Sequence, residues 1–231
     1  MTDRDAGLPV DLATRFDQFP ATVKGAFVMR GADGNPHAVE MTSCSLDRIP
    51  AGPSKPIPLG EVRVNVAPGR DLYVPFEAGV ADLDPGWYAI RSVIRVDAGP
   101  SLSFSSRGFS VQWPRELVRR GTLRAGRKVR VGKLEAELDT VEMRADCAVV
   151  AWSISPGKGG PGEAAPVGVE LFADGRELER IPPGARPLGP RAEARGGPRA
   201  VFYPVPREAE ALRVVFRAGT ASSEPVELPL P

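Results

Sequence analysis

Histidine occurs once in this chain of 231 residues, at His37, and this limits the chemistry that the sequence can support. A serine–histidine–acid triad would have to use His37, yet this residue follows a turn-forming Asn35-Pro36 pair and no Gly-x-Ser-x-Gly motif accompanies it. A zinc site of histidine and cysteine ligands would need paired spacings, which His37, Cys44 and Cys147 lack. We therefore expect His37 to be an exposed loop residue.

Two further motifs with chemical potential are incomplete. Asp33-Gly34-Asn35 is similar to the start of a calcium-binding loop, but the twelfth position is Cys44, which does not ligate a hard cation, so we expect a turn. The glycine-rich segment 157–162 includes Lys158 but lacks the Gly-Lys-Ser/Thr of a phosphate-binding loop. No carboxylate pair stands out as catalytic. The sequence thus predicts no catalytic residue, no metal site and no cofactor.

Positive charge is concentrated in one stretch of the chain. Between residues 113 and 133 there are eight basic residues against a single acid, Glu116. One interpretation is a basic ridge that receives an acidic partner. The alternative, favoured by the near-neutral net charge, is that these side chains pair with acids such as Asp82, Asp84, Glu135, Glu137 and Asp139. The predicted basic ridge consists of Arg115, Arg119, Arg120, Arg124, Arg127, Lys128 and Arg130.

The rest of the chain favours β-structure. After the turn pair Pro85-Gly86, the residues Tyr88, Ile90, Ile94 and Val96 alternate with a face that carries two arginines, as expected of a half-buried strand. Residues 134–143 alternate with a phase slip before Val141, and a helix is the competing interpretation there. Strands are expected at 22–30, 38–46, 61–66, 71–77, 87–96, 101–113, 128–131, 134–143, 147–154, 167–173, 177–181, 200–203, 212–216 and 226–228.

Turns and loops separate these strands. Proline and glycine each occur 25 times, which fits a protein with many turns. Asp174-Gly175 is the strongest short hairpin signal. The segment 182–199, rich in proline, glycine and arginine, predicts a long loop that is either a recognition loop or a solvated insertion.

We expect the chain to divide into two domains. Residues 1–20 are expected to form a loosely structured arm, in which Asp11 caps one helical turn. Residues 21–113 form the first β-sandwich, residues 114–120 a junction, and residues 121–231 the second β-sandwich.

One short motif resembles a known family. The pattern Leu83-x-Pro85-Gly86-x-Tyr88 is similar to the start of a late strand in immunoglobulin-like and fibronectin-type-III-like domains. The resemblance implies a tyrosine corner, in which the hydroxyl of Tyr88 bonds to upstream backbone. Trp152 similarly suits the core tryptophan of a central strand. The expected fold is all-β, with two such antiparallel sandwiches in tandem.

Composition narrows the environment and the partners. The net charge of +1 predicts neither a nucleic-acid nor a membrane partner. The N-terminal residues, which begin at Met1, do not resemble a secretory signal. The two cysteines, Cys44 and Cys147, fit buried reduced thiols, which indicates the cytoplasm. A composition rich in Ala, Gly, Pro, Arg and Val fits a bacterial source.

The function expected from these observations is that of a non-catalytic interaction or assembly module. Its partner would be a protein, either another copy or a different and acidic chain, held at strand edges and end loops. The alternatives are a module that binds a small ligand such as a carbohydrate or lipid, and, less favoured, a hydrolase with a carboxylate or serine site between the domains.

Overall fold

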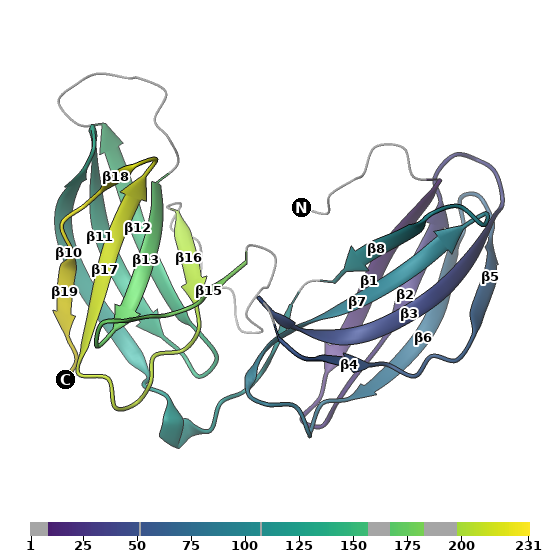
Figure 1. The fold of residues 1–231 in the computed structure, drawn as a ribbon, viewed down its shortest axis with the longest axis horizontal. Helices are drawn as coiled ribbons and strands as arrows, with labels where there is room; N and C mark the ends of the chain where they lie inside the picture. The colour runs from purple at the N-terminus through teal and green to yellow at the C-terminus, as the bar shows by residue number, and fades with distance from the viewer. Residues whose placement is uncertain (1–8, 51, 107, 157–166, 183–197) are drawn as a thin grey trace. The chain divides into compact units, whose positions relative to one another are not determined.

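The computed structural model describes residues 9–50, 52–106, 108–156, 167–182 and 198–231 (Figure 1). Every regular element in these ranges is a strand, apart from one turn of 3-10 helix, η1 (Arg115–Leu117). All pairings between named strands are antiparallel. The predicted all-β class is therefore confirmed. The chain divides into two compact units, and the boundary lies between Val111 and Gln112.

The first unit contains two sheets that share one core. One sheet has the order β1-β2-β6, and the other has the order β4-β3-β7-β8, with β5 also pairing with β3 and β9 with β7. A single cluster of buried apolar side chains draws on both, including Phe27 and Phe76 from the first sheet and Leu46 and Ile90 from the second. The strands are β1 (Val10–Gln18), β2 (Thr22–Gly31), β3 (His37–Ile49), β4 (Ser54–Pro56), β5 (Val62–Val66), β6 (Asp71–Gly79), β7 (Gly86–Val96), β8 (Ser101–Ser105) and β9 (Phe109–Val111).

Strand β7 has the predicted alternation from Ile90 onward, whereas Trp87 and Ala89 are buried although the sequence places them on the face of the two arginines. Tyr88, Ile90 and Ile94 are buried, whereas Arg91 and Arg95 are exposed. The hydroxyl of Tyr88 donates a hydrogen bond to the backbone carbonyl of Asp84, at 2.9 Å. The resemblance of the motif around Pro85-Gly86 to immunoglobulin-like domains implied a hydrogen bond of this kind, from Tyr88 to the backbone before it.

The expected N-terminal helical turn is wrong, because Val10–Gln18 forms strand β1. Its backbone pairs with β2 without interruption, from Val10 opposite Gly31 to Gln18 opposite Val23. Phe16 of β1 is buried and packs edge-to-face on Phe109, with ring centroids 5.7 Å apart. The edge of β2 supplies the hydrogen-bond partners that favour an extended chain here, and an isolated sequence stretch does not reveal them.

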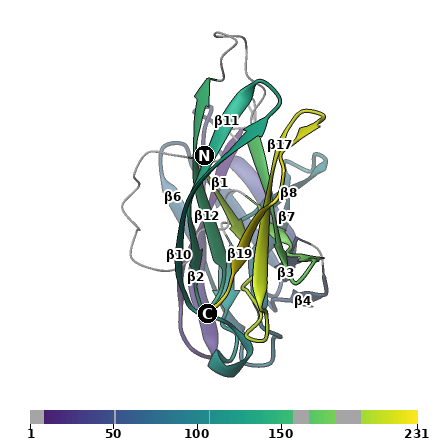
Figure 2. The same cartoon turned by 90° about the vertical axis from the view of Figure 1, so that its left-hand side faces the viewer.

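The second unit also consists of two sheets. Their orders are β10-β11-β12-β16-β15 and β14-β13-β17-β18, with β19 pairing with β17. In Figure 2 the teal β10 and the yellow β17 lie in separate layers. The strands are β10 (Gly121–Val131), β11 (Leu134–Met143), β12 (Ala148–Pro156), β13 (Val167–Ala173), β14 (Arg176–Glu177), β15 (Arg180–Ile181), β16 (Arg199–Phe202), β17 (Ala211–Ala218), β18 (Ala221–Ser222) and β19 (Val226–Pro229).

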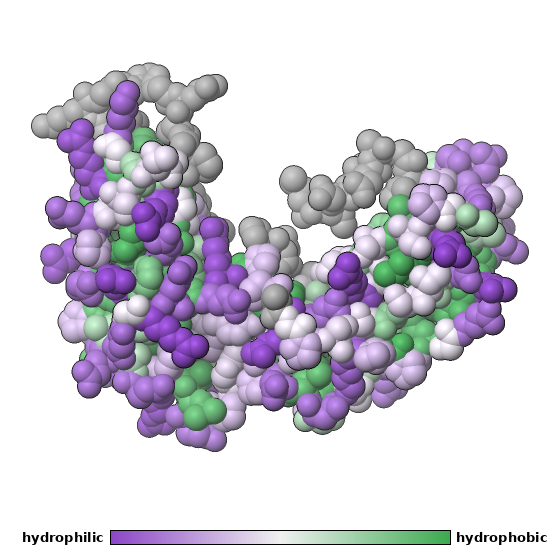
Figure 3. Space-filling model, in the orientation of Figure 1, coloured by the Kyte–Doolittle hydropathy of each residue, from purple (hydrophilic) through white to green (hydrophobic). Residues whose placement is uncertain are grey.

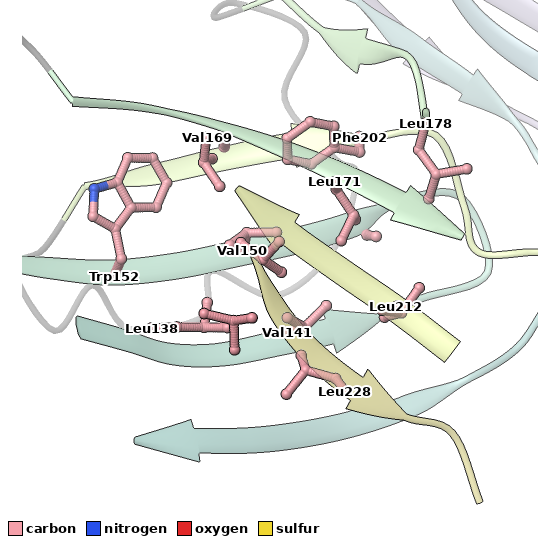
Figure 4. Packing of buried hydrophobic residues seen from close by; sticks show 14 of the residues in the cluster. Leu138, Val141, Val150, Trp152, Val169, Leu171, Leu178, Phe202, Leu212 and Leu228 are labelled. Atoms are coloured by element: carbon pink, nitrogen blue, oxygen red, sulfur yellow. The ribbon is translucent and has the colours of Figure 1, made fainter. Parts of the chain in front are cut away.

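The core of this unit lies between its two sheets (Figure 4). Leu138 and Trp152 from one sheet meet Leu171 and Phe216 from the other. Trp152 is buried on β12, which lies between β11 and β16, so the predicted core tryptophan on a central strand is confirmed. Its indole packs edge-to-face on Phe216 at 6.1 Å.

Two local predictions in the second unit are also confirmed. Residues 134–143 form a strand, and the predicted phase slip is a register shift between Leu138 and Thr140. Asp174 and Gly175 both have positive φ, of 47° and 81°, and they join β13 to β14 as a tight hairpin.

Candidate interaction surface

All seven residues of the predicted basic ridge lie in the second unit. Arg115 lies in η1, and Arg119 and Arg120 lie between η1 and β10. The remaining four ridge residues lie on β10, which is an edge strand of its sheet. In Figure 3 hydrophilic side chains predominate along the outer margin of this unit, where Figure 1 places β10.

The local sequence of β10 explains why its charges are exposed. Leu123, Ala125 and Val129 pack against the core and fix one face of the strand. A bulge at Gly126, whose φ is 54°, shifts the register between Arg124 and Arg127. Bulges and charged side chains on an edge strand hinder the addition of another strand. The bulge and the charges therefore hinder the pairing of another strand with the free edge of β10.

The distribution of ion pairs separates one ridge residue from the others. Lys128 lies 3.5 Å from Glu135 and 3.7 Å from Glu137, as the alternative interpretation expected. Asp82, another acid considered as a partner, pairs instead with Lys55 in the first unit. None of the six arginines of the ridge forms a salt bridge with any residue that the structure describes.

Arg119 has a structural role that the other ridge arginines lack. Its guanidinium donates hydrogen bonds to the carbonyl oxygens of Arg207, at 3.1 Å, and Pro231. Its backbone N–H donates to the carbonyl of Val205 at 2.9 Å. Arg119 therefore fastens the segment before β10 to the rest of the second unit.

Arg207 is the basic residue that sequence reasoning missed. It follows Pro206, which forms an isolated bridge with Val118, and its own N–H donates to the carbonyl of Leu117 at 3.1 Å. These contacts place Arg207 beside the ridge although it is 88 residues from Arg119. Its local sequence has no signal for this position.

The expectation that His37 is an exposed loop residue is wrong. His37 begins β3 and is only 8% exposed. Its Nδ1 lies 2.6 Å from a carboxylate oxygen of Asp97, and its Nε2 lies 2.7 Å from one of Asp33. Because carboxylates only accept hydrogen bonds, this geometry fits an imidazolium that donates from both nitrogens. Its two partners come from the segment before β3 and from the residue that follows β7.

Electrostatics reinforces this cluster. The hydrogen bonds that the His37 ring donates to Asp97 and Asp33 raise the pKa of His37. The bond to His37 in turn lowers the pKa of Asp33 to about 2 and also lowers that of Asp97. Asp33 also accepts a hydrogen bond from the backbone N–H of Asn35, at 3.1 Å. Residues Asp33-Gly34-Asn35 therefore form a turn, as the sequence predicts. The cluster ties this turn to the end of β7.

Both cysteines are free and buried, as predicted. Desolvation raises the pKa of Cys44 to about 12 and raises that of Cys147 further. Thiols with raised pKa values are poor nucleophiles and poor metal ligands at neutral pH. Within the described ranges, no group of three or more His, Cys, Asp or Glu residues is placed to hold a metal ion.

The outer face of β1-β2-β6 has a depression of about 560 Å³. Tyr73, which is 53% exposed, lies at its margin, and Arg15, Asp17 and Lys24 also line it. Gly25 also lines it, and β1 approaches this glycine so closely that a Cβ atom there would lie 2.1 Å from the carbonyl oxygen of Arg15. The predicted recognition loop at 182–199 lies largely outside the described residues.

Comparisons with known proteins add little to this geometry. No protein-family model and no curated protein matches the sequence. A similar solved structure is that of a conserved domain protein from Bacillus anthracis, at 12% identity over 97% of this chain and 88% of that one, with a TM-score of 0.38. This similarity is too low to support an inference. No helix in the described ranges has the length and apolarity needed to span a membrane.

Proposed function

We propose that the protein is a non-catalytic interaction module built from two immunoglobulin-like or fibronectin-III-like β-sandwich domains. In the first unit, successive strands are divided between the sheets β1-β2-β6 and β4-β3-β7-β8, as in a Greek-key sandwich. The hydrogen bond from Tyr88 to Asp84 corresponds to a tyrosine corner. In the second unit, two antiparallel sheets enclose a core that includes Trp152, which supports the same assignment.

The proposed binding surface is the basic ridge, and the proposed partner is a protein with an acidic segment. The observation that carries this proposal is that six arginines gather on and beside one edge strand without a carboxylate partner among the described residues. Guanidinium groups bind carboxylates in a bidentate manner, so such a group favours an acidic chain. The ridge concentrates seven basic residues in a chain whose net charge is only +1, and β11 beside it carries Glu135 and Glu137.

Cellular location is part of the same proposal, which places the protein in the bacterial cytoplasm. Two free, buried cysteines suit a reducing compartment. The composition, rich in alanine, glycine, proline and arginine, is associated with bacterial proteins.

Binding of a short fluorescent polyglutamate peptide tests the ridge, measured by fluorescence anisotropy on three proteins. The first is the wild type. The second is the ridge triple variant, which carries Arg124→Gln, Arg127→Gln and Arg130→Gln. The third is a control triple variant with the same charge change at exposed arginines elsewhere in the second unit: Arg176→Gln, Arg180→Gln and Arg199→Gln.

We expect the ridge triple variant to bind the peptide about tenfold or more weakly, because three charge-assisted contacts are lost. The control triple variant should bind like the wild type. Equal losses in the two variants would reject the ridge as a specific surface. If duplex DNA bound through the same arginines more tightly than the peptide, the assignment of a protein partner would be wrong.

A second candidate function, the binding of a carbohydrate, is favoured by the depression on β1-β2-β6. An exposed aromatic ring beside charged side chains suits a sugar, since the ring stacks on its apolar face and the charged groups bond its hydroxyls. Replacing Tyr73 with alanine should abolish binding in a glycan screen if this function is correct. The absence of any glycan that depends on Tyr73 would leave the ridge as the proposed site.

A further inference from the structure

A second basic feature lies at the start of the ridge, before strand β10, and shares Arg115, Arg119 and Arg120 with it. It is a hollow of about 420 Å³ that contains four guanidinium groups in its lining and no carboxylate side chain. We call it the arginine hollow, and its lining consists of Arg115, Val118, Arg119, Arg120, Arg207 and Pro231.

The wall of the arginine hollow is built by backbone and side-chain contacts. The bridge between Val118 and Pro206 and the bond from Arg207 N–H to Leu117 hold its two sides together. Arg119 adds a further link between these segments, because its guanidinium donates hydrogen bonds to main-chain oxygens of Arg207 and Pro231. The hollow is therefore formed by fixed backbone rather than by surface side chains alone.

Three of the four arginines are available to a ligand. Arg115, Arg120 and Arg207 are exposed, and their guanidinium groups form no hydrogen bond or ion pair with the residues that the structure describes. Like charges gathered in one hollow repel each other, and the repulsion is relieved when an anion binds between them. The ligand that suits this arrangement best carries more than one negative charge and several acceptor atoms.

We propose that the arginine hollow binds a phosphate monoester dianion. A phosphate group offers three strong acceptor oxygens and close to two negative charges at neutral pH, which matches convergent guanidinium groups better than a carboxylate does. The phosphate belongs either to a phosphorylated protein side chain or to a small phosphate compound, and the chemistry of recognition is the same. The arginines of β10, Arg124, Arg127 and Arg130, do not line the hollow.

Isothermal titration with three probes tests the inference: inorganic phosphate, a phosphoserine peptide and the same peptide without phosphate. The wild type is compared with the ridge triple variant and with a hollow triple variant of equal charge. The hollow triple variant carries Arg115→Gln, Arg120→Gln and Arg207→Gln. Arg119 is left unchanged because it fastens the backbone, and the unfolding midpoint of each variant confirms that it folds.

We expect the wild type and the ridge triple variant to bind the phosphate probes with similar affinity, and the hollow triple variant to lose about tenfold or more. Affinity should fall between pH 7.5 and pH 5, because the second pKa of a phosphate monoester is about 6. A phosphopeptide that binds more tightly than inorganic phosphate indicates a phosphorylated protein; the reverse indicates a small phosphate compound. Both outcomes support the shared chemistry.

Two results would overturn the inference. One is an equal loss of phosphate binding in the two triple variants, which would show diffuse attraction only. The other is acetate binding as tightly as phosphate at the same ionic strength. The polyglutamate peptide separates this test from the proposed function. Its binding should fall most in the ridge triple variant, which removes the arginines of β10, whereas phosphate binding should fall most in the hollow triple variant.

Discussion

The phenolic hydroxyl of Tyr88 donates a hydrogen bond to the backbone carbonyl of Asp84, 2.9 Å away. The bond spans the turn at Pro85-Gly86 and joins it to a tyrosine ring that is only 2% exposed. Because Tyr88 also stacks against Phe109, the turn, β7 and β9 are held as one structure.

Replacement of Tyr88 by phenylalanine tests this corner. It keeps the ring in the core and removes only the hydroxyl, so the free energy of unfolding should fall by about 1 to 3 kcal/mol. Tyr73→Phe is the matched control, since Tyr73 is 53% exposed and should change stability little. Urea denaturation measures both. Equal small effects at the two positions would remove the structural role assigned to Tyr88.

Titration of His37 by NMR tests the cluster at the start of β3. The chain has a single histidine, so its imidazole signals need no assignment. We expect a pKa above the ordinary value of 6.5, because Asp97 and Asp33 both bond to the ring. Asp97→Asn and Asp33→Asn should each lower it. A wild-type pKa at or below 6.5 would contradict the double hydrogen bond.

The same cluster predicts how stability depends on pH. A raised pKa for His37 gives stability that is fully present below about pH 6.5 and is lost as the pH rises through the folded-state value. The pKa of about 2 for Asp33 gives stability that is present above about pH 3.8 and is lost toward pH 2. The stability difference between wild type and His37→Gln should therefore shrink from pH 6 to pH 9. A constant difference would argue against this linkage.

Gly25→Ala tests whether β1 packs against β2 as described. A Cβ atom at Gly25 would lie 2.1 Å from the carbonyl oxygen of Arg15 and 2.7 Å from the Cβ atom of Phe16. We expect a loss of about 2 to 3 kcal/mol in unfolding free energy. Gly168→Ala is the control, because the nearest atom to its Cβ would be 3.9 Å away. Full stability of Gly25→Ala would place β1 elsewhere.

Thiol labelling tests the environment of the cysteines. Burial and a raised pKa keep Cys44 and Cys147 in the unreactive thiol form. Native protein should react with a disulfide reagent at pH 8 far more slowly than protein unfolded in guanidinium, which should release two equivalents of thiol per chain. Rapid labelling of the native state would mean that the thiols are accessible.

Local patterns in the sequence predict most of the strands for a simple physical reason. The alternation around Tyr88 and the hairpin signal at Asp174-Gly175 depend on neighbouring residues alone. The phase slip in β11 could likewise be read from spacing, since the apolar residues change register between Leu138 and Val141. The basic ridge was visible because its residues are close together along the chain.

The features that were missed depend on contacts between distant residues. His37 is buried because Asp97, 60 residues further along, bonds to its ring. Residues 10–18 form a strand because their backbone pairs with the edge of β2, where Phe16 lies opposite Gly25. Arg207 lies in the arginine hollow because its neighbour Pro206 forms an isolated bridge with Val118, which is distant in sequence. None of these contacts has a local signature.

The salt dependence of polyglutamate binding tests the central claim most directly. For the wild type, the account predicts affinity that falls steeply as sodium chloride rises from 50 to 300 mM, because exposed charges are screened over about 10 Å at 0.1 M salt. The ridge triple variant, without Arg124, Arg127 and Arg130, should bind weakly and show a much flatter dependence. The same steep dependence in wild type and variant would contradict the claim that the ridge is the binding surface.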